Sequence, residues 1–188
     1  SPQFNWQPYE DAIKRYCARY GLLPELQDKS KAESNVKKLF LKDTSIIDAL
    51  DLSINRVHQK KIKIKLEIDI NPPAGSQAKT QYLNFPVNFA IDSQDLPSNF
   101  ASKSHALLCR KYKKGRDWYD FDWYVSKQVT PNFALLTNAI NQVGPWKDQH
   151  IQVTPTWYLD KLKTEIETID WTQMKNAVKS FVKAEEQD

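Results

Sequence analysis

An alternation of apolar and charged residues over positions 60–70 constrains the fold more than any other feature of the chain. Every second position of the segment KKIKIKLEIDI carries an aliphatic residue: Ile62, Ile64, Leu66, Ile68 and Ile70. Because successive side chains point to opposite faces of a strand, this period of two predicts a β-strand with one apolar face. We expect Ile64, Leu66 and Ile68, at its centre, to be buried. The opposite, polar face would carry Lys63, Lys65, Glu67 and Asp69.

Other segments predict a helix and three further strands before residue 97. Residues 8–20 place four side chains on one helical stripe: Ile13, Tyr16, Cys17 and Tyr20. A proline begins this segment and Gly21 follows it, as is typical of helix ends. The sequence VKKLFL within residues 31–42 predicts a strand, and TQYLNF and VNFAID predict two shorter ones.

The pattern turns helical from residue 97 onward. Helices are expected over residues 98–112, 117–129, 132–143, 156–168 and 171–184, with Ser98, Thr154 and Asp170 as N-caps. Strands followed by helices favour an α+β fold. We expect a sheet-bearing domain over residues 1–96 and a helical C-terminal domain over residues 97–188.

Composition excludes several functional classes. The 188 residues carry a net charge of +4 and contain no apolar run near the ~20 residues of a membrane span. The four glycines form no GxxxxGK loop, which excludes a P-loop enzyme. The three histidines have no cysteine or carboxylate at ligand spacing, which disfavours a zinc site. The two cysteines form no disulfide framework, so a cytoplasmic location is expected.

The stretch RKYKKGRDWYDFDWYV, residues 110–125, concentrates basic charge and then alternates acids with aromatic rings. A structural interpretation is that Asp117 favours the helix dipole and that Arg116 pairs with Asp120 one turn later. The five aromatic residues of its second half nearly encircle the helix, so most of them are expected in a core or an interface. The alternative is a nucleic-acid patch, since exposed rings beside cations stack on bases.

Two groups of charged side chains could instead form a catalytic site. On the predicted strand, Glu67 beside Lys65 would suit a metal-binding carboxylate next to a phosphate-binding lysine. In the helix that begins near residue 98, Lys103 and Arg110 are seven residues apart and share one face. The ordinary interpretation of both groups is a solvated surface, and spacing alone leaves both interpretations open.

Two motifs together carry a resemblance to a known family. The segments KLEIDINPPAG at 65–75 and FASKSHALLCRKYKKGRDWYDFDWYV at 100–125, with GPW at 144–146, resemble the nucleotidyltransferase toxins of the AbiEii/AbiGii family. That family is the toxin half of type IV toxin–antitoxin, or abortive infection, systems. The resemblance implies part of a DNA polymerase β-like nucleotidyltransferase fold, a short mixed or antiparallel sheet followed by a C-terminal helical bundle. It also implies Mg²⁺ or Mn²⁺ and an NTP substrate.

The resemblance assigns roles to individual residues. The lysine and acid of the strand motif correspond to Lys65 and Glu67, and Glu67 would be the third carboxylate of the metal site. Lys103 corresponds to a helical lysine that contacts nucleotide phosphates. The RDxxD motif corresponds to Arg116, Asp117 and Asp120. The predicted catalytic residues are therefore Lys65, Glu67, Lys103, Asp117 and Asp120; the phosphate-binding residues are Lys63, Lys103, Arg110 and Arg116; the metal ligands are Glu67 and Asp69.

The chain departs from the family pattern at the first motif, a glycine-serine or glycine-threonine turn followed by a DxD pair. The one glycine-serine pair, at Gly75, follows the strand motif, and Asp48 and Asp51 have the wrong spacing for a metal-binding pair. Nucleotidyl transfer relies on metal ions that hold the attacking and leaving oxygens. We therefore expect the chain to be the C-terminal part of a longer protein, or of a family member divided at this point, and to be inactive by itself.

Two other functions remain open. Residues 60–65 and 110–116 could form a basic nucleic-acid-binding module without catalysis, whose affinity would fall steeply with salt. Alternatively, the aromatic residues could form a surface for a partner protein such as a cognate antitoxin. The expected partners are an NTP, an RNA acceptor and the antitoxin, with no membrane.

Overall fold

A computed structural model describes residues 4–43, 62–85, 88–179 and 182. Asp48, Asp51 and the first two residues of the 60–65 basic segment lie outside these ranges. The described residues form six helices and two small antiparallel sheets, which confirms the predicted α+β class. The chain packs as two compact units, Ser1–Pro72 and Pro73–Asp188, and each unit contains one of the sheets.

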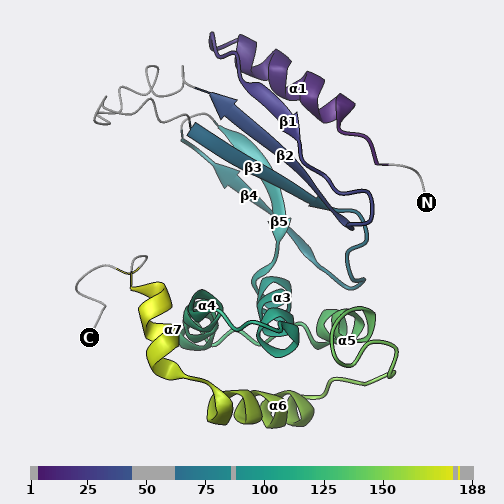
Figure 1. Ribbon diagram of the computed structural model, residues 1–188, viewed down its shortest axis with the longest axis vertical. Helices are drawn as coiled ribbons and strands as arrows, with labels where there is room; N and C mark the ends of the chain where they lie inside the picture. The colour runs from purple at the N-terminus through teal and green to yellow at the C-terminus, as the bar shows by residue number, and fades with distance from the viewer. Residues whose placement is uncertain (1–3, 44–61, 86–87, 180–181, 183–188) are drawn as a thin grey trace. The chain divides into compact units, whose positions relative to one another are not determined.

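The first unit is a three-stranded antiparallel sheet with one helix. Helix α1 (Gln7–Ala18) is followed by β1 (Glu25–Asp28), β2 (Val36–Asp43) and β3 (Ile62–Asp69), with β2 in the centre (Figure 1). Leu39 of β2 lies opposite Leu66, and Lys38 lies opposite Glu67. Lys38, Phe40 and Lys42 thus share a face with the charged residues of β3, and Leu39 and Leu41 share the opposite face with its aliphatic residues.

The predicted strand exists, but its apolar face is less buried than expected. Its four charged residues are all exposed, as predicted: Lys63, Lys65, Glu67 and Asp69. Ile64 is 43% exposed, so its predicted burial is wrong, and Leu66 and Ile68 are half-buried. The reason is that β3 is an edge strand of this sheet, whereas the central strand β2 buries Leu39 and Leu41.

Helix α1 also differs from its prediction. Tyr16 and Tyr20, which were expected on an inward stripe, are 52% and 57% exposed, and no residue of the helix is fully buried. The buried aromatic residue is Trp6, which precedes the helix and donates a hydrogen bond from Nε1 to Ser30 Oγ at 2.9 Å. A buried indole with its N–H satisfied therefore attaches the start of α1 to the loop before β2.

The second unit begins with a hairpin and continues as a set of helices. Strands β4 (Ala78–Leu83) and β5 (Phe89–Gln94) pair antiparallel and lead into α3 (Leu96–Cys109). The chain continues through α4 (Gly115–Ser126), α5 (Phe133–Gln142), α6 (Pro155–Thr168) and α7 (Trp171–Val178). The hairpin thus packs in the unit that contains the helices, although the predicted domain boundary follows residue 96. Compact units do not define functional domains, so the domain division stays a prediction.

Helix starts in the second unit follow capping chemistry. Thr154 and Asp170 cap α6 and α7 with their side chains, as predicted. The predicted cap Ser98 is wrong, because Asp95 caps α3 and accepts a hydrogen bond from the Ser98 N–H at 2.8 Å. Pro97 explains the earlier start, since a proline without an N–H fits the first turn of a helix.

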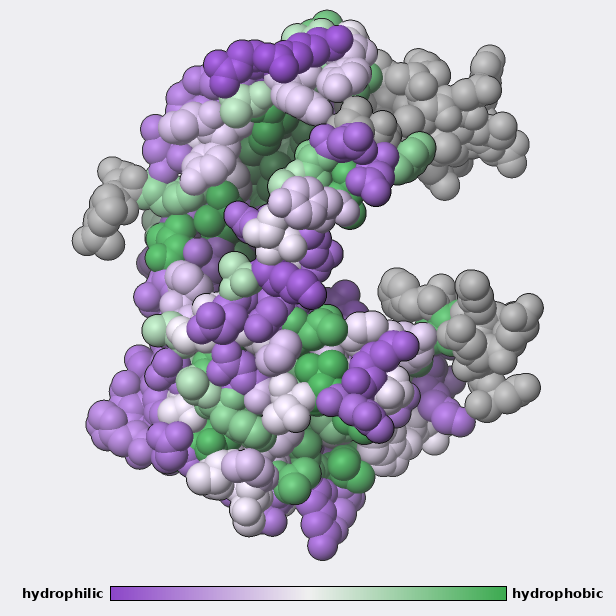
Figure 2. Space-filling view, turned by 180° about the vertical axis from the view of Figure 1, so that it is seen from behind, coloured by the Kyte–Doolittle hydropathy of each residue, from purple (hydrophilic) through white to green (hydrophobic). Residues whose placement is uncertain are grey.

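Helix α3 lies between α4 and α5, and α4 also contacts α7 (Figure 1). Buried residues from five helices and one loop form the core: Ala101, Leu107, Leu108, Trp118, Leu135, Leu136, Ile140, Val153, Tyr158, Leu162 and Met174. The aromatic residues of α4 divide between core and surface, because Trp118 and Tyr124 are buried while Tyr119 and Trp123 are 48% and 41% exposed. Figure 2 shows hydrophobic residues interspersed with hydrophilic ones on its visible face.

A glycine allows α4 and α7 to approach closely. A Cβ atom added to Gly115 would lie 2.2 Å from the Met174 carbonyl oxygen and 3.2 Å from Ala177 Cβ. Only a residue without a side chain fits at this contact. The first residue of α4 is thereby fixed against the backbone of α7, which sets the position of Asp117 two residues later.

Candidate functional site

Two ion pairs join α3 to α4 in the second unit. Lys103 Nζ lies 2.5 Å from Asp120 Oδ2, and Arg110 Nη1 contacts Asp117 Oδ2. The cations come from α3 and the residue that follows it, and the acids come from α4. The structure thus brings together four of the predicted site residues as two matched pairs, and each acid holds one cation.

The two pairs differ in burial. The Asp117 side chain is 5% exposed, whereas the Asp120 side chain is 36% exposed. The side chains of Lys103 and Arg110 are 41% and 39% exposed. Both cations therefore reach solvent, and of the two acids only Asp120 does. Charge-assisted hydrogen bonds of this kind are stronger than neutral ones and restrict the cation's direction.

Arg110 begins a basic turn between α3 and α4. It lies just past the end of α3, with φ −74° and ψ 128°, so the chain leaves the helix at this residue. The turn continues with Lys111 and Lys114, and Arg116 follows in the first turn of α4; all three are exposed. Lys113 points elsewhere: its ammonium donates to the Leu107 carbonyl at 2.6 Å and pairs with Glu165 of α6 at 2.6 Å.

The structural interpretation of α4 from the sequence is partly wrong. Asp117 does lie in the first turn of α4, where a negative charge favours the helix dipole. Asp120 pairs with Lys103 of the neighbouring helix, although Arg116 was the predicted partner. Helical spacing identifies neighbours on the same helix, but it carries no information about a cation on the next helix.

A buried tyrosine lies beside the Lys103–Asp120 pair. Tyr124 stacks on Phe100 of α3 with ring centroids 4.8 Å apart and planes 7° apart. Burial raises the pKa of Tyr124, and the charges of Lys103 and Asp120 also act on its hydroxyl. The stacked rings form an apolar support next to the ion pair, which lowers the local dielectric around it.

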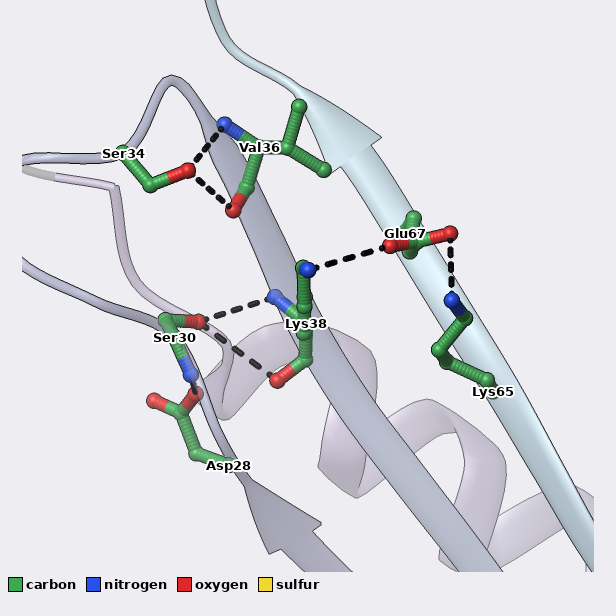
Figure 3. A network of polar contacts seen from close by, with 7 residues as sticks. All are labelled: Asp28, Ser30, Ser34, Val36, Lys38, Lys65 and Glu67. Atoms are coloured by element: carbon green, nitrogen blue, oxygen red, sulfur yellow. Dashed lines mark hydrogen bonds and ion pairs between the residues drawn. The ribbon is translucent and has the colours of Figure 1, made fainter. Parts of the chain in front are cut away.

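The strand motif forms a separate polar network in the first unit. Glu67 lies between two ammonium groups, with Lys65 Nζ at 3.0 Å from Oε2 and Lys38 Nζ at 3.5 Å from Oε1 (Figure 3). Hydrogen bonding and charge from Lys65, followed by Lys38, hold the pKa of Glu67 below its usual value. Glu67 is ionised near neutral pH, and its charge is balanced by the two lysines.

Lys38 is a residue of this network that sequence reasoning missed. The hydroxyl of Ser30 accepts from the Lys38 N–H at 3.0 Å and donates to the Lys38 carbonyl at 3.5 Å (Figure 3). The Ser30 N–H in turn donates to Asp28 Oδ1 at 2.7 Å. The sequence predicted a strand at VKKLFL, but the partner of Lys38 depends on the register between β2 and β3.

The same face of β2 and β3 carries further cations around an aromatic ring. Lys63 Nζ lies 4.3 Å from the centroid of the Phe40 ring, and Lys42 donates to Gln27 Oε1 at 3.0 Å. Together with Lys38 and Lys65, they make a lysine-rich face. It is suited to phosphate groups, because its lysines outnumber the single acid that they contact.

The residues described in the structure do not fit a divalent metal ion. Within residues 4–43, 62–85 and 88–179, no three His, Cys, Asp or Glu side chains converge. The Glu67 carboxylate already contacts two lysines, and Asp69 Oδ1 accepts from the Asn71 N–H at 2.9 Å. Hard cations require several oxygen ligands directed at one point. The metal-binding roles of Glu67 and Asp69 stay predictions.

The predicted site residues fall into two groups. Lys63, Lys65, Glu67 and Asp69 belong to the first unit, and the remaining five belong to the second: Lys103, Arg110, Arg116, Asp117 and Asp120. The resemblance assigns both groups to one catalytic site, and that assignment stays a prediction. No helix in the described ranges is long and apolar enough to cross a bilayer.

Comparison with known proteins agrees with the motifs at this site. No curated protein and no solved structure matches the chain. A protein-family model matches residues 3–188, nearly the whole chain, and its description is nucleotidyl transferase AbiEii toxin, type IV TA system. The match includes both the strand motif and the α3–α4 ion pairs. The chain belongs to this family of nucleotidyl transferase toxins of type IV toxin–antitoxin systems.

Proposed function

We propose that the protein acts in the cytoplasm as the toxin of a type IV toxin–antitoxin system, where it transfers a nucleotide from an NTP to an acceptor. Membership of the family supports the enzyme class and implies a cognate antitoxin. RNA is the proposed acceptor, because the exposed basic residues Lys111, Lys114 and Arg116 suit a polyanion. We propose that the reaction requires Mg²⁺ or Mn²⁺, since nucleotidyltransferases generally use a divalent metal.

The observation that carries this proposal is the pair of cations at α3. Lys103 and Arg110 each reach solvent and are each held by an acid from α4. Phosphoryl and nucleotidyl transfer depend on groups positioned to bind phosphate oxygens before the reaction begins. A lysine and an arginine with restricted directions are suited to bind the triphosphate of an NTP.

Residues 1–188 lack the first motif of the family pattern, whose DxD pair would hold the metal ions for nucleotide transfer. Residues 1–188 contain no DxD pair ahead of β3, and the described residues present no metal site. Lysine and arginine can bind a triphosphate, but they cannot replace the ions that stabilise the attacking and leaving oxygens. We therefore propose that residues 1–188 bind NTP weakly and do not transfer a nucleotide by themselves.

A labelled-NTP assay on total RNA tests this function. It compares residues 1–188 with a chimera in which the glycine-serine and DxD segment of another family member precedes them. We expect label in RNA from the chimera alone, and a loss of about tenfold or more with Lys103→Ala. Lys147→Ala is the matched control, because Lys147 is an exposed lysine whose side chain lies outside the α3–α4 pairs. Transfer by residues 1–188 alone, or none by a folded chimera with any NTP, would contradict the proposal.

A second candidate is a nucleic-acid-binding module without catalysis, which the lysine-rich face of β2 and β3 favours. Four lysines on this face surround Phe40: Lys38, Lys42, Lys63 and Lys65. Binding through phosphate contacts makes the logarithm of affinity fall linearly with the logarithm of salt concentration. This function would be favoured if the chimera transfers no nucleotide but binds RNA tightly, and if Lys42→Ala weakens that binding.

A further inference from the structure

Asp117 is an acid of the RDxxD motif that solvent barely reaches. Its side chain is 5% exposed, and its carboxylate is committed to Arg110. A metal ion or an acceptor hydroxyl could approach this carboxylate only if Arg110 moved away. That movement would leave a buried charge without compensation, which is strongly unfavourable. Direct contact between Asp117 and substrate is therefore disfavoured by burial and by pairing together.

Arg110, in contrast to Asp117, is accessible to solvent and has donors left for a ligand. Its guanidinium is 39% exposed, and Asp117 is its one ion-pair partner among the described residues. A guanidinium has five N–H donors in a rigid plane, so one carboxylate leaves donors free. Planar donors of this kind match the oxygens of a phosphate group. Asp117 fixes one edge of the group, and the exposed part remains open to an anion.

The position of Arg110 adds to this argument. Lys103, also held by an α4 acid, lies seven residues earlier, or about 10 Å along α3. Helix α4 thus restrains two cations that both face solvent, and it is itself fixed by the contact of Gly115 with α7. The acids of α4 act as supports, and the cations of α3 and the turn are the groups available to a ligand.

We propose that Asp117 is a positioning residue that acts through Arg110, and that the open donors of Arg110 bind phosphate oxygens of the NTP. This inference rests on the proposed function and deepens it. It replaces the catalytic role expected for Asp117 from the sequence motif with an indirect one. Arg110 makes the phosphate contact, and Asp117 holds the plane of the guanidinium.

The sign of one substitution separates this role from that of a merely neighbouring acid. A carboxylate near a bound triphosphate repels it, so removal of a merely neighbouring Asp117 would strengthen binding. A positioning role predicts the reverse, because Asp117→Asn removes the charge that orients Arg110. The substitution is nearly isosteric, so it changes charge with little change in volume.

The test is a titration of residues 1–188 with inorganic triphosphate at low salt, in which amide NMR shifts report the binding. We expect Arg110→Ala and Asp117→Asn each to weaken binding by about tenfold, the loss of one charge-assisted hydrogen bond. The double variant should bind no more weakly than Arg110→Ala, because both changes remove the same contact. Arg110→Lys keeps the charge without the planar fork, and it should also bind more weakly than the parent.

Glu165→Gln is the matched control. It removes the acid of the neighbouring Lys113–Glu165 pair, while the Lys113 ammonium keeps its bond to the Leu107 carbonyl. Its affinity for triphosphate should equal that of the parent or exceed it slightly. A loss equal to that of Asp117→Asn would show a general effect of helix packing and would overturn the proposal.

The remaining outcomes separate the inference from the function on which it rests. Equal or tighter binding by Asp117→Asn, or parental binding by Arg110→Ala, overturns the inference and leaves the proposed function intact. If Asp117→Asn does not fold, Asp117→Glu takes its place: it keeps the charge but displaces the carboxylate, so it should also weaken binding, and parental binding by it overturns the inference. A parent chain that binds no triphosphate overturns the inference together with the proposed phosphate site.

Discussion

Burial gives the two acids of α4 different chemistry, although they lie one turn apart. Asp120 is 36% exposed on its side chain and can exchange Lys103 for a ligand, whereas Asp117 is enclosed. The RDxxD motif therefore combines an enclosed acid, Asp117, with an accessible one, Asp120. Asp117 pairs with Arg110, and Asp120 pairs with Lys103.

Cys109 illustrates a residue whose environment suppresses ionisation. Burial raises the pKa of Cys109 to about 11, and Gly144 lies against it so closely that an added Cβ would be 2.9 Å from Sγ. The folded state favours the thiol over the thiolate, whereas the unfolded chain ionises near pH 9. The contribution of Cys109 to stability is thus complete below pH 9 and is lost as the pH rises to about 11.

We predict that the free energy of unfolding decreases between pH 9 and 11 and that Cys109→Ala makes this decrease smaller. Urea denaturation of both proteins under reducing conditions, at intervals from pH 8 to 11, measures the effect. The comparison uses the slope of the unfolding free energy with pH. Absolute stability is unsuitable, because the loss of the sulfur also removes packing contacts. Identical slopes for the two proteins would contradict the assigned cause.

The sequence predicted individual charged residues better than it predicted their partners. Lys103 and Asp120 were expected in one site, and they form a pair. The Lys38–Glu67 contact and the burial of Asp117 were not foreseen. Spacing along one strand or helix defines which side chains share a face, but partners on another element depend on register and packing.

At the scale of elements, the contact between α4 and α7 determines where the site residues lie. Gly115 contributes to this contact, because its missing side chain leaves room for the Met174 carbonyl. Trp118, one turn later, packs against Trp171 with ring centroids 5.2 Å apart. The helix that supplies Asp117 and Asp120 is therefore fixed by small and aromatic residues on its other side.

Gly115→Ala should destabilise the protein by about 1–3 kcal/mol, the usual cost of overpacking. Alanine is the better helix former by roughly 0.5–1 kcal/mol, but its Cβ would lie 2.2 Å from backbone that cannot move without shifting α7. Thermal and urea denaturation give the change. Ser126→Ala, at the exposed other end of α4, is the control and should change stability by less than about 0.5 kcal/mol. A Gly115→Ala protein as stable as the parent would show that α7 is not held in this way.

Element types could be predicted from the sequence more reliably than their ends and their burial. The alternation at 62–70 identified β3, and Thr154 and Asp170 identified two helix starts. The short strand β1 was missed, because Glu25–Asp28 has no alternation of its own and is a strand only through pairing with β2. The exposure of Ile64 was missed because an edge position cannot be recognised within one strand.

At the scale of the whole molecule, we assign phosphate binding to the second unit. The paired cations at α3, the basic turn and the supporting acids all lie within Pro73–Asp188. The strand motif in Ser1–Pro72 forms a self-contained network in which Glu67 is balanced by Lys65 and Lys38. The family match covers both groups, and we propose that the α3–α4 pairs are the part that binds an anionic substrate.

The most direct test of this assignment is an amide NMR titration of residues 1–188 with each of the four NTPs at low salt. We expect weak binding, with the largest shifts at Lys103, at Arg110 and in the residues that follow up to Arg116. Lys103→Ala should reduce these shifts, whereas Lys147→Ala should leave them unchanged. Shifts confined to β1–β3, or no shifts with any NTP, would contradict the claim that the ion-paired cations of α3 and α4 form the nucleotide phosphate site.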